Sequence, residues 1–159
     1  MSNNRLAVAI ISNQPQLIRS LTLKLSPNSC CTFEWDLLDE ALQLIRELES
    51  RSSKPSPSDE LLINEIYSQL LANIKQADVV VIAKVADAAD PLDLCALSLG
   101  YALGLQKKLI SYNLHSYSHA LFQVRQIITE RQLQLQLSTM AQELGRTFNI
   151  DSIFSIQDF

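Results

Sequence analysis

Two uninterrupted apolar runs, rich in β-branched residues, restrict the folds open to this chain. One lies in "RLAVAIIS", residues 5–12, and the other is "DVVVIAKV", residues 78–85. A strand with one solvent-exposed face alternates apolar and polar side chains, whereas a continuous apolar run is typical of a strand that is buried on both faces. Such strands belong to parallel sheets, whose connections are long enough to hold helices. The runs therefore predict a parallel sheet covered by helices.

The segments between these runs have helical or strand character. Pro15 suits a first helical turn, and Leu17, Leu21 and Leu25 follow at a spacing of four residues. The leucines of 133–137 alternate as in a strand, but a helix is favoured there because Thr129 with Gln132 forms a capping box. In chain order we expect strands over 5–12, 31–35, 78–85, 107–113 and 125–129, and helices over 15–25, 39–50, 58–76, 90–104 and 130–145, with Ser58 or Asp59 capping the third helix.

Strands that alternate with helices predict an α/β fold. We expect a flavodoxin-like or Rossmann-like three-layer sandwich with a parallel sheet of about five strands. With 159 residues, 47% of them apolar, the chain suits one domain over 1–159. The serine- and proline-rich residues 50–59 are expected to form an exposed loop.

Composition excludes several classes of function. The net charge of −4 comes with no basic stripe, so nucleic-acid binding is not expected. The first apolar run is too short to span a membrane, and we expect a cytoplasmic protein. Cys30, Cys31 and Cys95 have no metal-ligand spacing and are expected to be reduced. No glycine lies between the first apolar run and the helix expected after it, which excludes a glycine-rich phosphate loop, and we expect no cofactor.

The stretch "DAADPLDLCALSLGYALG", residues 87–104, follows a strand on the side where parallel sheets bind ligands. Asp90 suits the cap of the following helix and Asp93 its first turn, which leaves Asp87 as the carboxylate available to a ligand. We expect Gly100 and Gly104, four residues apart, to let the helix approach the sheet or another helix closely. One face of this helix is expected to carry Leu94, Cys95, Ser98, Tyr101 and Ala102.

Residues 77–112, "ADVVVIAKVADAADPLDLCALSLGYALGLQKKLISY", resemble the nucleoside 2-deoxyribosyltransferases and the related deoxynucleoside monophosphate glycosidases. In that family an Ala-Asp strand precedes an Asp-containing loop, a Gly-Thr pair, a helix with Glu-Leu-Gly-Tyr-Ala and a strand that opens Lys-Pro. Here "SLGYA" stands at the Glu-Leu-Gly-Tyr-Ala position, and Leu94 and Cys95 stand at the Gly-Thr pair. The family's Tyr-Leu-Ala-Gly-Pro loop corresponds to "ISNQP", where only Pro15 matches.

The resemblance implies a carboxylate that attacks the anomeric carbon of a deoxyribose and releases the base. Ser98 occupies the position of that nucleophilic Glu, so the resemblance implies that catalysis is lost. The resemblance implies a sugar contact at Asp87, and Asp90 and Tyr101 also match the family. Cys95 and Asn13, at positions that differ from the family, are further candidates for ligand binding. The resemblance further implies a homodimer or a higher homo-oligomer.

Other side chains offer alternative chemistry. Cys95 lies near a helix N-terminus, which can activate a thiol, although a small buried residue is the commoner role. His115 and His119 have the spacing of two metal ligands but no third ligand, so no metal site is expected. Glu34, Trp35 and Asp36 are expected to end the second strand, where Trp35 can stack on a base or Asp36 can cap a helix.

Three functions therefore remain open. The first is a deoxyribosyltransferase-like domain without catalysis, which binds a nucleoside- or nucleotide-type ligand or serves as an assembly module. The second is an active, divergent enzyme that cleaves N-glycosidic bonds of deoxynucleosides, with Asp87 or a partner subunit supplying the carboxylate. The third is a structural domain that binds other proteins.

Overall fold

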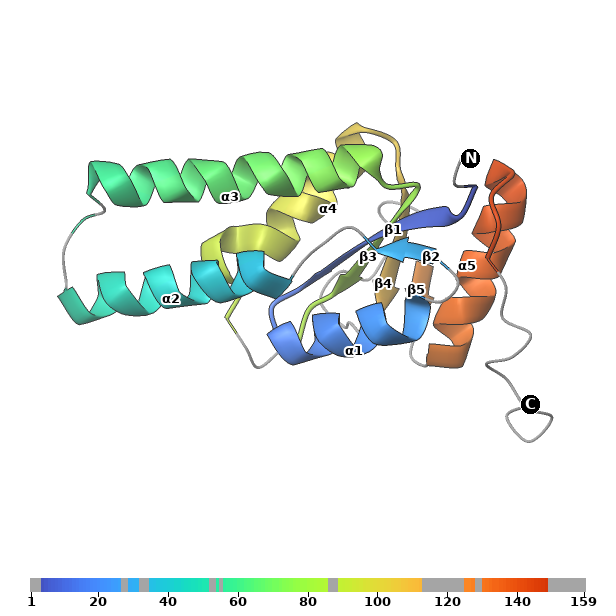
Figure 1. Cartoon of the computed structure of the whole chain (residues 1–159), viewed down its shortest axis with the longest axis horizontal. Helices are drawn as coiled ribbons and strands as arrows, with labels where there is room; N and C mark the ends of the chain where they lie inside the picture. The colour runs from blue at the N-terminus through green and yellow to red at the C-terminus, as the bar shows by residue number, and fades with distance from the viewer. Residues whose placement is uncertain are drawn as a thin grey trace.

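The computed structural model describes residues 4–26, 29–31, 35–51, 54, 56–85, 89–112, 125–127 and 130–148. These residues form an α/β fold around a parallel sheet, which confirms the predicted class (Figure 1). The strands lie in the order β2-β1-β3-β4-β5. Their bounds are β1 Leu6–Ser12, β2 Ser29–Cys31, β3 Val79–Ala83, β4 Lys108–Tyr112 and β5 Arg125–Ile127.

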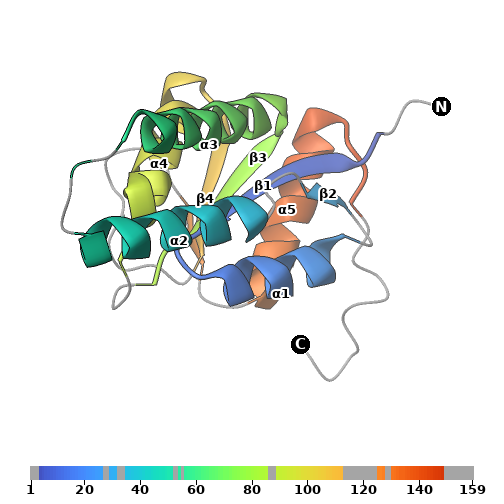
Figure 2. The same ribbon diagram turned by 60° about the vertical axis from the view of Figure 1, so that its left-hand side comes forward.

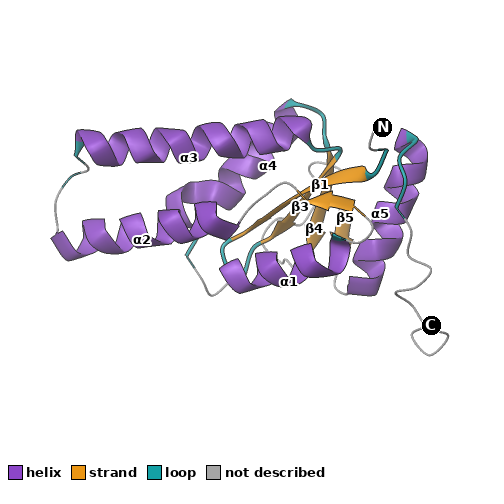
Figure 3. Ribbon diagram, in the orientation of Figure 1, coloured by secondary structure: helices purple, strands orange, loops and turns teal. Residues whose placement is uncertain are grey.

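Helices cover both faces of the sheet (Figure 3). One side carries α1 (Pro15–Leu25) and α5 (Glu130–Leu144), and the other carries α3 (Pro57–Gln76) and α4 (Leu94–Gly104). The helix α2 (Trp35–Arg51) lies beside α3, and this hairpin extends past the carboxyl ends of the strands (Figures 1 and 2). In the described part of the chain, no helix is both long and apolar enough to cross a membrane.

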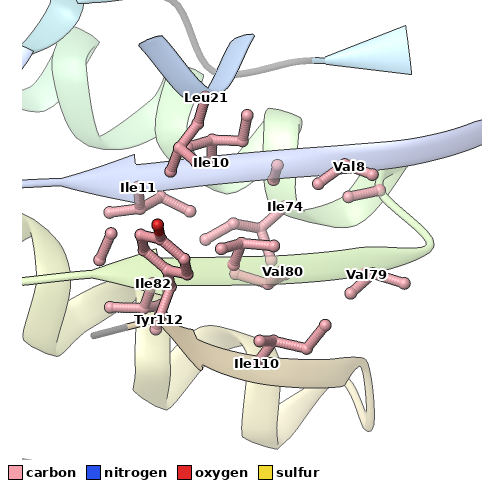
Figure 4. Packing of buried hydrophobic residues seen from close by; sticks show 14 of the residues in the cluster. Val8, Ile10, Ile11, Leu21, Ile74, Val79, Val80, Ile82, Ile110 and Tyr112 are labelled. Carbon is pink, nitrogen blue, oxygen red and sulfur yellow. The ribbon is translucent and has the colours of Figure 1, made fainter. Parts of the chain in front are cut away.

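The central strands are as buried as their sequences predict. All five residues of β3 are buried, and in β1 only Ala7 is partly exposed. The buried cluster joins side chains of β1, β3 and β4 with side chains of α1 and α3 (Figure 4). Burial of this continuous apolar surface is the main force that holds the helices on the sheet.

Several expected boundaries are confirmed and others are wrong. The helix over 15–25 and the helical choice for 130–144 are confirmed. The second strand is present, but its expected bounds, 31–35, are wrong, because β2 comprises Ser29–Cys31, and Trp35 and Asp36 begin α2. The exposed loop is shorter than expected, because α2 continues to Arg51 and α3 begins at Pro57.

The cap of α3 differs from the expected one. Ser56 is the cap, and its hydroxyl accepts a hydrogen bond from the backbone N–H of Asp59 at 3.2 Å. The Asp59 carboxylate accepts in return from the Ser56 backbone N–H at 2.9 Å. These two bonds form a capping box in which Asp59 takes the third helical position.

The glycines of α4 do not mediate close packing. Gly100 and Gly104 are exposed, and a Cβ atom added to either would meet no atom within 4 Å. The expectation that they bring this helix close to a neighbour is therefore wrong. The buried stripe of α4 consists instead of Leu94, Cys95, Ser98 and Ala102.

Candidate functional site

The candidate site lies at the carboxyl ends of β1 and β3. From β1 the chain crosses to β2 on one side, and from β3 it crosses to β4 on the other, so the direction of winding reverses between β1 and β3. Parallel α/β sheets bind ligands in the crevice at such a reversal. Asn13 and the first turn of α1 follow β1 there, and the stretch that leads to α4 follows β3.

The crevice between β1 and β3 is bridged by side chains of the protein itself. The Asn13 amide donates from Nδ2 to the Val85 carbonyl at 2.9 Å and accepts at Oδ1 from the Val85 N–H at 2.8 Å. The Ser12 hydroxyl donates to the Ala83 carbonyl and accepts from the Gln14 N–H at 3.1 Å. Asn13 is 3% exposed, and its amide extends the β1–β3 ladder beyond the last paired residues. Asn13, expected as a ligand contact, therefore ties the two strands together.

A strained turn precedes α4. Pro91–Asp93 forms a short 3-10 turn in which Leu92 and Asp93 have φ values of 53° and 56°. Both lie in the left-handed region, which costs about 1 kcal/mol or more for each non-glycine residue. The turn folds Asp90 back over the start of the helix, where its carboxylate accepts from the N–H groups of Cys95 at 2.9 Å and Ala96 at 3.2 Å. Asp90 thus caps α4, as expected. The nearest N–H group that it binds, that of Cys95, lies five residues later in the chain.

Tyr67 of α3 holds this turn from outside. Its hydroxyl donates to the Leu92 carbonyl at 2.8 Å. Its pKa is raised by burial first, and then by Asp93, Tyr101 and Asp90. No local pattern singles out Tyr67, because its bond to Leu92 joins residues 25 positions apart and depends on how α3 packs on α4.

Ser98 is fully buried at 0% exposure. Its hydroxyl donates to the Leu94 carbonyl of its own helix at 2.6 Å. Such back-bonding to the preceding turn is common for serine inside helices. Ser98 therefore faces the interior, and its proton is held by the helix backbone.

Cys95 is also fully buried, and its thiol is not in a disulfide. Burial raises the pKa of this thiol strongly, the Asp90 carboxylate raises it further, and Lys84 opposes the shift. Reactive thiols need a lowered pKa and access to solvent. Cys95 has neither, so the small buried residue is the role that its surroundings support.

An open hollow lies beside these bonded residues, at the start of α1. It measures about 380 Å³ and is lined by Gln14, Pro15, Gln16, Arg19 and Asp39. The Arg19 guanidinium contacts the Asp39 carboxylate at 3.3 Å, and both side chains are about half exposed. No side chain caps α1 and no acid lies in its first turn, so the positive end of the helix dipole and the Arg19 guanidinium lie at one space. These positive groups suit a polar or anionic ligand.

Most of the remaining expected site residues are not among the residues that the structure describes. Asp87, His115, His119, Glu34 and the proposed cap Thr129 lie outside the described residues. Tyr101 is half-buried on α4 and lies near Tyr67. Among the residues that the structure describes, no group of three or more His, Cys, Asp or Glu side chains could hold a metal ion.

Comparison with known proteins identifies no relative of this chain. No protein-family model, no curated protein and no solved structure matches the chain.

Proposed function

We propose that this chain is a nucleoside 2-deoxyribosyltransferase-like domain that has lost base exchange and binds a nucleoside- or nucleotide-type ligand. Its fold is proposed to be the flavodoxin-like three-layer sandwich, whose strand order 2-1-3-4-5 is the order of this sheet. The proposal is supported by the resemblance over residues 77–112, whose described part contains β3, the turn, α4 and β4 in that order.

The observation that carries the loss of catalysis is the state of Ser98. A covalent nucleophile must reach the anomeric carbon and must be activated by a base or by a lowered pKa. The Ser98 hydroxyl has no solvent exposure and donates its hydrogen bond to Leu94. Cys95, one turn earlier, is equally buried and its pKa is raised. Neither position supports a glycosyl intermediate.

The proposed ligand position is the hollow at the start of α1. Gln14 and Pro15, two of its lining residues, belong to "ISNQP", the segment that corresponds to the family's Tyr-Leu-Ala-Gly-Pro loop. Arg19 supplies the charge that a monophosphate would meet, and Asp39 supplies an acceptor for hydroxyl groups. Binding of a phosphate would compete with the Arg19–Asp39 ion pair.

The test has an activity arm and a binding arm. Base exchange and hydrolysis are followed by chromatography on several deoxynucleosides and their monophosphates, and no turnover is expected. Ligand binding is followed as a rise in melting temperature, since a ligand that binds the native state stabilises it. The rise is expected to be lost in Arg19→Ala and kept in Arg46→Ala, a matched control at an exposed arginine of α2.

Two outcomes favour the other functions. Turnover that survives Ser98→Ala and vanishes in Asp87→Ala contradicts the lost catalysis and supports the divergent enzyme. If no nucleoside or nucleotide changes the melting temperature, the ligand part of the proposal is wrong and the protein-binding domain takes its place.

A further inference from the structure

Charges are separated along the direction of the strands. The α2–α3 hairpin, past the carboxyl ends of the strands, is rich in carboxylates: Asp39, Glu40, Glu47, Glu49, Asp59, Glu60 and Glu65. The opposite end, near the amino ends of β1 and β4, carries Arg5, Lys75, Lys107, Lys108 and Arg146. The hairpin also carries Arg46, Arg51 and Lys54, and at the other end Lys108 pairs with Glu143 and Arg146 with Asp78. Acids remain in excess at the first end and bases at the second, so the two ends of one molecule have opposite net charge.

The acidic end contains a hollow with an apolar floor, named here the acidic groove. It lies between α2 and α3, measures about 270 Å³, and is lined by Glu40, Gln43, Leu44, Glu47, Asp59 and Leu62. Leu44 is only 3% exposed at its base, and the neighbouring Leu61 is 70% exposed on α3. Three carboxylates around two leucines suit a group that is apolar at its centre and cationic at its edge.

The basic end presents such a group at the turn after α4, named here the basic turn and formed by Leu105, Gln106 and Lys107. Leu105 is 42% exposed at its tip. Two backbone bonds fix the turn, from Gln106 N–H to the Leu103 carbonyl at 3.1 Å and from Lys107 N–H to the Ala102 carbonyl at 2.9 Å.

Lysines flank this leucine at the basic end. The Lys107 ammonium donates to the carbonyl of Lys75, the penultimate residue of α3, at 2.9 Å. The Lys75 side chain is itself exposed. A rigid exposed leucine with lysines beside it therefore stands at one end of the molecule.

The acidic groove and the basic turn cannot meet within one molecule. Asp59 and Leu62 lie in the first turns of α3 and Lys75 lies in its last turn. A straight helix of this length, 20 residues, separates its ends by about 30 Å. Figure 1 shows the turn after α4 near the carboxyl end of α3, away from the hairpin end of that helix.

We propose that the basic turn of one copy docks in the acidic groove of a second copy. Leu105 enters between Leu44 and Leu62, and Lys75 and Lys107 face Glu40, Glu47 and Asp59. The contact is head-to-tail, so each pair keeps one groove and one turn unused, and further copies extend the assembly as a chain or close it as a ring. Charge complementarity and the apolar centre on both sides select a second copy as the occupant.

The test is sedimentation velocity over a range of protein concentrations, at about 20 mM and about 0.5 M salt. The wild type is expected to associate with rising concentration, and association is expected to weaken at least tenfold at the higher salt. The groove variant Glu40→Lys/Glu47→Lys and the turn variant Leu105→Asp are each expected to remain monomeric. Matched controls with the same chemistry elsewhere are Glu65→Lys, at an exposed acid of α3, and Leu23→Asp, at a leucine of α1 that is 76% exposed.

A mixture of the two variants separates this contact from any symmetric one. The groove variant keeps an intact turn and the turn variant keeps an intact groove, so an equimolar mixture is expected to form dimers and nothing larger. Lys75→Glu provides a second turn variant, and far-UV circular dichroism verifies that each variant is folded.

Three results would overturn the proposal. They are a wild type that stays monomeric at every concentration, controls that abolish association as completely as the groove and turn variants, and a mixture that does not associate. A groove that binds a lysine-rich peptide while the wild type stays monomeric would identify a different occupant and would equally overturn it.

Discussion

Replacement of Asp90 tests whether this carboxylate caps α4 or serves a ligand. It accepts two backbone hydrogen bonds, at 2.9 and 3.2 Å, at the start of the helix. Asp90→Ala removes a capping interaction worth about 1 kcal/mol and a favourable charge at the helix dipole worth about 0.5–1 kcal/mol. We expect the free energy of unfolding to fall by about 1.5–2 kcal/mol, and Asp90→Asn, which keeps one acceptor oxygen, to lose about half of that.

Equilibrium unfolding in urea, followed by far-UV circular dichroism, measures this change as a midpoint lowered by about 0.5–1 M for Asp90→Ala. Asp93→Asn is the matched control, because Asp93 is exposed, its side chain caps nothing, and asparagine tolerates its left-handed backbone. The control is expected to stay within about 0.5 kcal/mol of the wild type. A loss below about 0.5 kcal/mol for Asp90→Ala would refute the capping role and return Asp90 to the ligand contacts.

Further changes probe the bridge, the helix ends and the buried thiol. Asn13→Ala leaves the partly buried N–H and carbonyl of Val85, two residues after β3, without the Asn13 amide and should lower the free energy of unfolding, measured in urea, by about 2–3 kcal/mol; a loss below about 1 kcal/mol would contradict the bridge. Gln106, with φ 58°, and Gly145, with φ 69°, lie after α4 and α5 with positive φ values, which glycine adopts with the least strain. Gln106→Gly should therefore raise the melting temperature by about 1–3 °C, and Gly145→Ala should lower it. Melting temperatures that change in the same direction for both variants would contradict this reasoning. Gly100→Ala should stabilise by about 0.5–1 kcal/mol, because its Cβ meets open space, and destabilisation would reveal a contact. The pKa of the Cys95 thiol is raised in the folded state, so stability should decline as pH rises above about 8.5, where only the unfolded thiol ionises. Cys95→Ala should flatten that part of the pH profile measured in urea, and an unchanged slope would contradict the buried thiol.

The parts of the fold that the sequence predicts well are those fixed by local pattern. The runs of β1 and β3 are apolar at every buried position except Ser12, the last residue of β1, and α1 begins at a proline whose φ suits the first helical turn. For α5, the four-residue repeat prevails over the alternation of its leucines, because a helix buries Leu133 and Leu137 together. The type and position of these elements can be predicted without knowing which distant residues they contact.

The errors lie where the tertiary partner decides. β2 has three residues and pairs only with β1, so its position is set by the register of a neighbour. The aromatic residues after it have high strand propensity, yet Trp35 starts a helix. For Gly100 and Gly104, spacing shows that they share a face of α4, but it cannot show that this face looks toward solvent.

The same limit applies to the candidate site. Asp90 was predictable as a cap because its bonds reach only five and six residues along the chain. The bonds of Asn13 to Val85 span 72 residues, and that of Tyr67 to Leu92 spans 25. Such pairs are defined by strand order and helix packing, so residue type alone does not distinguish an amide that ties two strands from one that contacts a ligand.

The difference between this chain and an active deoxyribosyltransferase would then be larger than one residue. A glutamate at position 98 would bring a charged group into a place with no solvent exposure, and burial of an unpaired carboxylate costs several kcal/mol or raises its pKa until it is neutral. A neutral or displaced carboxyl is a poor nucleophile. Asn13 would also have to release Val85 before the crevice between β1 and β3 could admit a sugar. The buried position 98 and the bridge between β1 and β3 therefore each block the reaction. Burial would prevent a group at position 98 from acting as the nucleophile, and the Asn13–Val85 bridge would prevent the sugar from entering, so restoring one of them alone would not restore base exchange.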